Sequence, residues 1–130
     1  MTERVEQRVR DAVQAALDKK AFELDVLAVA KLTSIADYFL VCSGNTERQT
    51  QAIADAIEER LRERHQVRPT FVEGTNVGRW ILMDYGDFLV HIFTEECRRF
   101  YGLERLWGDA PNVAAEFMDE TERERRQTGR

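Results

Sequence analysis

The sequence is poor in cysteine, histidine and proline, and it contains no long apolar run. Its 130 residues include two cysteines, two histidines and two prolines. Cys42 and Cys97 lie far apart and form no Cys-x-x-Cys pair, so the spacing of a zinc site is missing. No segment approaches the roughly 18 apolar residues of a membrane span, and the charged start MTERVEQRVRDAV is unlike a signal peptide. We therefore expect a cytoplasmic protein without a membrane segment, a metal or a cofactor.

The chain also lacks an excess of positive charge. It has 24 acidic and 19 basic residues, which give a formal net charge of −5. Proteins that bind a phosphate backbone broadly need clustered lysine and arginine, so little direct contact with nucleic acid is expected. An acidic surface is compatible with a basic protein partner, which complementary fields would attract. Because many acidic proteins have no such partner, the charge balance permits this interpretation without selecting it.

Cys42 follows an apolar run and is predicted to be a small buried hydrophobic residue. The alternative is a catalytic thiol, but no base is visible that would pair with it.

Hydrophobic periodicity predicts an α/β fold. Val5, Val9, Val13 and Leu17 recur every four residues and predict a helix over residues 2–19. Thr46, with a glutamine three residues later, has the pattern of a capping box and opens a second helix that runs to about residue 65. Alternating or apolar runs predict strands at 22–30, 37–44, 70–74, 79–84 and 87–93, followed by a helical turn from 94 that breaks near Gly102. This order predicts one mixed sheet with helices packed against it.

The chain is predicted to form one domain, residues 1–115, with a charged tail at 116–130. The stretch DETERERRQTGR carries four acids and four arginines and no apolar residue, so it is expected to be disordered. Val113, Phe117 and Met118 are candidates for a last contact turn.

The stretch WILMDYGDFLVHIF, residues 80–93, is predicted to be a β-hairpin with different chemistry on its two faces. A two-residue turn at Tyr85-Gly86 would pair Met83 with Phe88 and Ile81 with Val90, which makes one face wholly apolar and suited to the core. On the other face Leu82 would oppose Leu89 and Trp80 would oppose His91, with Phe93 continuing the row.

Three interpretations of this second face remain open at this point. The aromatic residues, rimmed by Arg79, Asp84, Asp87 and Glu95, match the anchor-and-rim anatomy of a protein interface. Alternatively a helix covers the face, and His91 is satisfied inside the core. A catalytic His91 is the third interpretation, but no nucleophile or metal ligand is visible beside it.

Two motifs resemble the ribosomal silencing factor family, also called iojap-like. They are W-x-x-x-D-x-G-D-x-x-x-H, beginning at Trp80, and R-R-x-Y-x-L-E-x-L-W, beginning at Arg98. The segments LDV, KLTSIADYFLVCSGNTERQTQAIADAIEE and EG match in order before them, so the resemblance spans roughly residues 5–111. It implies a nucleotidyltransferase-like α/β fold and a binding protein rather than an enzyme.

The family resemblance also implies a partner and a role. Such factors dock on large-subunit ribosomal protein fourteen, block joining of the small and large subunits, and so damp translation when nutrients are scarce. The alternative is a large-subunit assembly factor that uses the same surface. Homodimers are also associated with the family.

Carried over to this sequence, the resemblance assigns partner-binding residues. Trp80, Leu82, Tyr85 and Phe93 match apolar contacts of the family, while His91 either orients Trp80 or bridges to the partner. Asp84 and Asp87 are expected to serve turn chemistry and interface charge. For Arg98, Arg99 and Tyr101, a packed, ion-paired helix turn and a direct contact stay equally open, and Trp107 is expected to anchor the C-terminal segment.

The implied fold raises an enzymatic alternative that these residues do not favour. Nucleotidyl transfer needs a Gly-Ser turn and a carboxylate pair that holds magnesium on phosphates. This chain has the reverse order at Ser43-Gly44, and Asp84 and Asp87 straddle a turn. We therefore expect no catalytic residue.

Overall fold

The structure, a computed structural model, describes residues 2–102 and 108–118. Its helices are α1 (Thr2–Asp18), α2 (Glu47–His65) and α3 (Glu95–Tyr101), with a 3-10 turn η2 (Ala114–Phe117). Its strands are β1 (Phe22–Ala28), β2 (Tyr38–Gly44), β3 (Phe71–Glu73), β4 (Trp80–Asp84) and β5 (Phe88–Thr94). In the described ranges, no helix has the length and apolar character that crossing a membrane requires.

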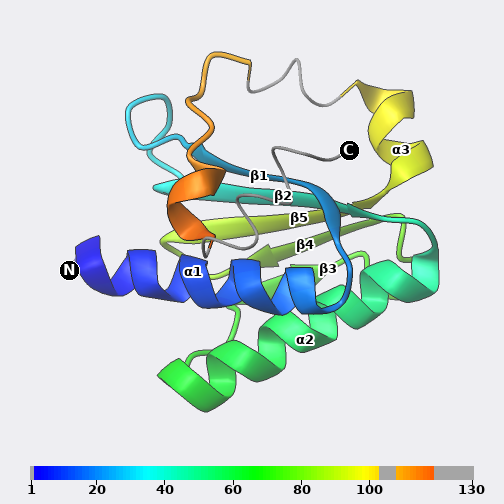
Figure 1. The fold of residues 1–130 in the computed structure, drawn as a ribbon, viewed down its shortest axis with the longest axis horizontal. Coiled ribbons are helices and arrows are strands. Elements are labelled where there is room, and N and C mark those ends of the chain that lie inside the picture. Colours follow the sequence, from blue (N-terminus) through cyan, green and yellow to red (C-terminus); the bar gives the residue numbers. More distant parts are fainter. Residues whose placement is uncertain (1, 103–107, 119–130) are drawn as a thin grey trace.

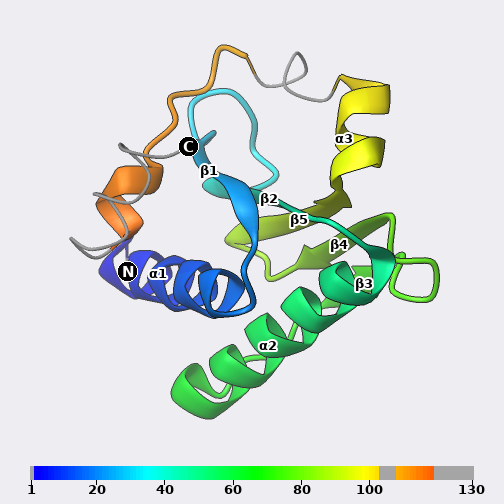
Figure 2. The same ribbon diagram turned by 45° about the vertical axis from the view of Figure 1, so that its right-hand side comes forward.

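The strands form one mixed sheet in the order β1-β2-β5-β4-β3. β2 and β5 run parallel, and the other neighbours are antiparallel. Helices α1 and α2 lie on one face of the sheet and α3 lies on the other, while the C-terminal segment runs down past the β1 edge to place η2 beside α1 (Figures 1 and 2). The predicted α/β architecture is therefore confirmed, and every residue of β5 is buried because helices or loops cover both faces.

The main core lies between the sheet and the two long helices. Val9 and Val13 of α1 and Ile53 and Ile57 of α2 are fully buried against the sheet. They are the apolar stripes that the helical periodicity predicted. Cys42 lies in the same core, where burial raises the pKa of its thiol to about 12, so it packs as a small hydrophobic residue.

The C-terminal segment closes the outer edge of β1. The Val113 amide donates to the Val26 carbonyl at 2.7 Å, and the Ala28 amide donates to the Pro111 carbonyl at 2.9 Å. Beyond this pairing, Phe117 and Met118 are buried in the main core. The packed part of the chain thus reaches residue 118, three residues past the predicted domain boundary, and Trp107 and residues 119–130 lie outside the described ranges.

The predicted N-cap of α2 at Thr46 is present, but the return hydrogen bond of the capping box goes to the residue before the cap. The Thr46 hydroxyl accepts from the Gln49 amide at 3.0 Å, and the Gln49 side chain accepts from the Asn45 amide at 2.7 Å. Gln49 also donates to the carbonyls of Lys19 and Lys20, each at 3.1 Å. One side chain therefore caps α2 and fixes the turn between α1 and β1 against it.

The predicted register of the β4–β5 hairpin was wrong, although the predicted faces were right. Ile81 pairs with Ile92 and Met83 with Val90, and the Tyr85 amide donates to the Phe88 carbonyl at 3.0 Å. The turn is thus Gly86-Asp87, one residue later than expected. The Gly86 amide donates to the Asp84 carboxylate at 2.8 Å, and Gly86 has a φ of +87°, which favours glycine. A shift of two in pairing leaves every side chain on its face.

Gly74 and Gly86 have nearly the same φ, so alanine substitutions at the two positions separate the cost of backbone strain from the cost of a steric clash of the added Cβ. A Cβ on Gly74 (φ +89°) would lie 2.1 Å from the Trp80 carbonyl oxygen, whereas a Cβ on Gly86 would meet nothing within 4 Å. We expect Gly86→Ala to cost about 1 kcal/mol of unfolding free energy through strain. Gly74→Ala should cost about 1–3 kcal/mol more because β4 must move. Urea unfolding of both variants measures the difference, and equal losses would contradict the close approach.

Candidate functional site

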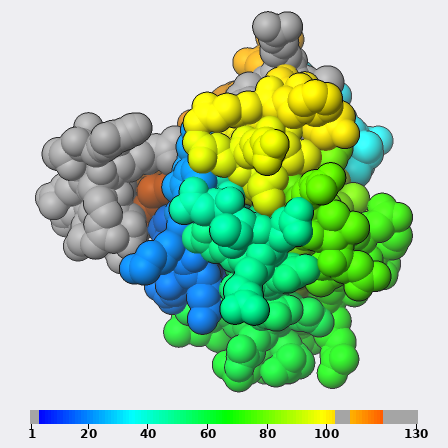
Figure 3. Space-filling view, turned by 90° about the vertical axis from the view of Figure 1, so that its right-hand side faces the viewer, coloured from blue at the N-terminus to red at the C-terminus, as the bar shows by residue number. Residues whose placement is uncertain are grey.

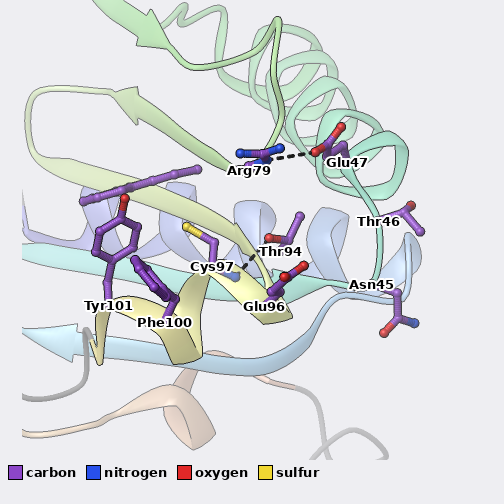
Figure 4. Close-up of a pocket in the computed structure, with 10 residues that line it drawn as sticks. Asn45, Thr46, Glu47, Arg79, Thr94, Glu96, Cys97, Phe100 and Tyr101 are labelled. Atoms are coloured by element: carbon purple, nitrogen blue, oxygen red, sulfur yellow. Dashed lines mark hydrogen bonds and ion pairs between the residues drawn. The ribbon is translucent and has the colours of Figure 1, made fainter.

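A hollow of about 700 Å³ opens where α2 begins, β4 begins and α3 ends. Figure 3 shows α3, in yellow, above the start of α2, in blue-green, on this side of the molecule. In Figure 4 Phe100 and Tyr101 stand on one side of the hollow, and Arg79 and Glu47 stand on the other. The lining residues are Asn45, Thr46, Glu47, Arg79, Trp80, Thr94, Glu96, Cys97, Phe100 and Tyr101.

The wall formed by β4 is attached to the first turns of α2. The Thr50 hydroxyl donates to the Gly78 carbonyl, and the Gln51 amide group donates to the Thr75 carbonyl at 2.8 Å. Arg79 Nε lies 3.1 Å from a Glu47 carboxylate oxygen. These bonds fix the backbone immediately before Trp80, so the position from which the Trp80 side chain projects is fixed as well.

The wall formed by α3 is attached through Arg98, which is 4% exposed. Its guanidinium donates to the Glu23 carbonyl at 2.6 Å and to the Ser43 hydroxyl at 2.9 Å. It also pairs with the Asp25 carboxylate at 2.9 Å. For Arg98 the packed, ion-paired alternative is therefore the one observed, while Arg99 is exposed and pairs with Glu95 one turn earlier.

Three neighbouring aromatic rings are exposed at the hollow, and we call them the aromatic patch: Trp80, Phe100 and Tyr101. Their side chains are 39%, 79% and 58% exposed, respectively. The Tyr101 ring lies 6.0 Å from Trp80 and 5.0 Å from Phe100, measured between centroids. Phe100 was not among the predicted site residues. Its position directly before Tyr101, in a helix too short to bury both rings, was the available signal.

Two of the predicted contact residues lie beneath the patch. Phe93 is fully buried with its ring 5.0 Å from Trp80, and His91 is 7% exposed. The Trp80 indole Nε1 donates to His91 Nδ1 at 3.3 Å. Burial lowers the pKa of His91 to about 4, so the imidazole is neutral at pH 7 and its Nδ1 is available as an acceptor.

The remaining predicted residues lie away from the hollow. Tyr85 faces the α2 side of the sheet, where its ring stacks on Phe88 at 5.1 Å and burial raises the pKa of its hydroxyl. Asp84 and Asp87 lie at the turn, the opposite end of the hairpin from Trp80. Leu82 lies between the two ends and is partly buried against a smaller core cluster that contains Phe39 and Phe93. The fold thus groups Trp80, His91, Phe93 and Tyr101, and it separates them from the acidic turn.

The serine of the enzymatic alternative has a structural role. Ser43 is fully buried, its hydroxyl accepts from Arg98, and it lies 3.4 Å from a Glu23 carboxylate oxygen. Burial also raises the pKa of Cys97, which lines the hollow. Across residues 2–102 and 108–118, no three histidine, cysteine, aspartate or glutamate side chains gather in a way that could hold a metal ion.

Curated relatives resemble most of this chain. A ribosomal silencing factor from Halalkalibacterium halodurans is 44% identical over 105 residues, which cover 81% of this chain and 89% of that protein. Its counterpart from Bacillus subtilis is 41% identical over 82% of this chain and 89% of its own. A chloroplast Iojap protein from Zea mays is 31% identical over 80% of this chain and 45% of its own.

Solved structures agree with the fold, and a family model agrees with the relatives. A Bacillus halodurans crystal structure superposes with a TM-score of 0.72 at 38% identity, covering 81% of this chain and 94% of that one. A Chromobacterium violaceum structure gives 0.75 at 33% identity, covering 78% and 84%. The family described as "Ribosomal silencing factor during starvation" matches residues 2–130. This chain therefore belongs to the ribosomal silencing factor family.

Proposed function

We propose that this protein is a non-enzymatic translational repressor of the cytoplasm. It binds large-subunit ribosomal protein fourteen and thereby blocks joining of the two ribosomal subunits under nutrient limitation. Family membership supports the coarser statement, silencing of translation at the ribosome. The observation that supports a protein-docking mode is the aromatic patch beside the hollow, where three rings face solvent.

The aromatic patch has the composition of an interface centre. Trp and Tyr side chains commonly provide most of the binding energy of an interface because they bury large areas with little loss of rotamer freedom. Trp80 suits this role because the hydrogen bond to His91 and the contact with Phe93 hold its inner edge while its outer edge stays exposed. Leu82 extends the apolar surface along β4, and Arg99 adds an exposed cation on α3.

Carboxylates surround the aromatic patch and fit a basic partner. Glu47 and Glu96 line the hollow, and Glu95 lies at the start of α3. Two of these acids have an arginine partner within the chain, since Glu47 pairs with Arg79 and Glu95 with Arg99. Both arginines are exposed, so a partner's cations can compete for these carboxylates. Ribosomal proteins are typically basic, which makes the rim complementary to one.

A sucrose-gradient experiment separates the repressor from the assembly factor. Deletion of the gene should leave mature subunits unchanged and impair the starvation-induced loss of joined ribosomes. Accumulated large-subunit precursors would favour the assembly alternative. Sedimentation of the purified protein, with and without the ribosomal protein, tests whether a homodimer forms and whether it persists in the complex.

Truncation of Trp80 tests the docking surface. A tryptophan at the centre of an interface commonly contributes about 2–4 kcal/mol, so Trp80→Ala should weaken binding to isolated ribosomal protein fourteen by roughly 30-fold or more. The variant should stay folded because Ile81 and Met83, on the opposite face, retain the core. Calorimetric titration gives the affinity, and thermal melting of the same sample gives the stability.

Phe71→Ala is the matched control. Phe71 is also an exposed aromatic residue, at 46%, but it lies on the edge strand β3 rather than at the hollow. Its truncation should leave the affinity unchanged within about 2-fold. Equal losses in the two variants, or a large drop in the melting temperature of Trp80→Ala with normal affinity of its folded fraction, would show that the hollow is not the docking surface.

Ionic strength tests the role of the acidic rim. Complementary charges accelerate association more than they strengthen the final complex, and salt screens them over about 10 Å at 0.1 M. The association rate should therefore fall as salt is raised. Glu95→Gln and Glu96→Gln, beside the aromatic patch, should each lower it slightly, whereas Asp84→Asn and Asp87→Asn, at the far end of the hairpin, should lower it less. Stopped-flow mixing at two salt concentrations measures the rate. An association rate that does not depend on salt would show that the acidic residues do not accelerate association with the partner.

A further inference from the structure

We propose that His91 is a positioning residue for Trp80: its Nδ1 holds the indole in the orientation that docks, and His91 itself does not touch the partner. The inference rests on the proposed function in one respect, namely that Trp80 contacts the partner. It assigns the histidine a single role, whereas the sequence left open whether His91 orients the tryptophan or bridges to the partner.

The position of the imidazole is fixed by aromatic neighbours. The ring of His91 stacks on Phe93 with an angle of 4° between the planes and a centroid distance of 6.1 Å. It meets the Phe39 ring edge-on at 5.5 Å and 72°. The backbone of β5 is paired on both sides, with β2 and with β4. An imidazole enclosed in this way has little freedom to move, so it can serve as a fixed reference for a more mobile neighbour.

The indole has fewer constraints of its own. Trp80 lies diagonally across the strand pair from His91, because Trp80 opposes Phe93 while His91 opposes Leu82. Its ring contacts Phe93 and Tyr101 at tilted angles of 45° and 51°, and such contacts tolerate rotation. The directional bond is the one from Nε1 to His91 Nδ1, at 3.3 Å. It selects one orientation of the exposed ring edge.

The chemistry of the pair requires a neutral imidazole of one tautomer. An indole Nε1–H can only donate, so Nδ1 must carry the lone pair and the ring proton must sit on Nε2. The hydrophobic surroundings keep the ring neutral at pH 7. A leucine would fill the same space with an apolar side chain that cannot be charged. What the histidine adds is therefore a hydrogen-bond acceptor rather than core volume. Holding a side chain in its bound orientation improves affinity because less entropy is lost on docking.

Two substitutions separate the acceptor from the bulk of the ring. His91→Asn places an amide oxygen near the position of Nδ1, while His91→Leu keeps apolar bulk and removes the acceptor. The first readout is the indole ¹H–¹⁵N signal of Trp80, identified as the signal that Trp80→Phe removes. We expect the leucine variant to shift this signal and speed its exchange with solvent, and the asparagine variant to restore it in part. An unchanged signal in the leucine variant would overturn the proposal.

A double-mutant cycle tests whether His91 acts through Trp80. A hydrogen bond contributes about 0.5–1.5 kcal/mol net, so His91→Leu should weaken binding to ribosomal protein fourteen by roughly 2- to 10-fold. In a Trp80→Phe background the same substitution should have no further effect. A loss that persists without Trp80 would mean that His91 touches the partner directly, which contradicts the proposal. If the unmodified protein does not bind ribosomal protein fourteen, the proposed function fails, while the indole signal still decides the positioning role.

Acidification provides a test on the unmodified protein, in case a variant fails to fold. Because the folded pKa of His91 lies near 4 and that of unfolded histidine near 6.5, the unfolded chain binds more protons between these values. The contribution of the neutral His91 to the free energy of unfolding is complete above pH 6.5, and it declines as the pH falls towards 4. The Trp80 indole signal should move over the pH range in which His91 protonates, and it should not do so in His91→Asn. If the indole signal does not change over this pH range, the hydrogen bond between Trp80 and His91 is contradicted.

Discussion

The buried guanidinium of Arg98 is the interaction on which the arrangement of the site depends. It joins α3 to the backbone at Glu23, to Ser43 of β2 and to the Asp25 carboxylate. Asp25 in turn accepts from Asn112 at 2.7 Å, and the Asn112 side chain accepts from the Val26 and Ala114 amides. One network therefore places α3 over the sheet and fixes the segment that closes β1. Losing one partner of a buried pair typically costs about 3–5 kcal/mol, because the other charge is left without compensation.

The network also explains an unusual backbone conformation in β1. Glu23 has a φ of +49°, and the β1–β2 register shifts between Phe22 and Asp25. A non-glycine residue in the left-handed region is strained and persists only where surrounding contacts stabilise it. Here the Glu23 carbonyl receives a hydrogen bond from Arg98, and its carboxylate lies beside the Ser43 hydroxyl. The bulge thus turns a carbonyl towards α3, and the strain is coupled to the position of the helix that presents Phe100 and Tyr101.

The two faces of the sheet have separate tasks. The face towards α1 and α2 is mostly aliphatic, and it provides most of the core. The other face is smaller and aromatic, with Phe39, His91 and Phe93 inside and Trp80 leading out to Tyr101 and Phe100. Because the strong core lies on the far side of β4, the exposed end of Trp80 can serve recognition at little cost to the fold. The sequence contains this division as the alternation of Ile81 and Met83 with Trp80 and Leu82.

The sequence by itself determined the element order, the N-cap at Thr46, the two faces of the hairpin, the burial of Cys42 and the family. These follow from local chemistry, namely side-chain periodicity, capping preferences and turn residues, which act within a few positions of the chain. Only the tertiary structure decided the hairpin register, the burial of Phe93 and His91 and the opposite placement of Tyr85. It alone placed the start of α2 and α3 on opposite sides of one hollow, through the long-range contacts of Arg98 and of the 74–78 loop. Such contacts join residues that are distant in the chain, and no local pattern specifies which distant residues will meet.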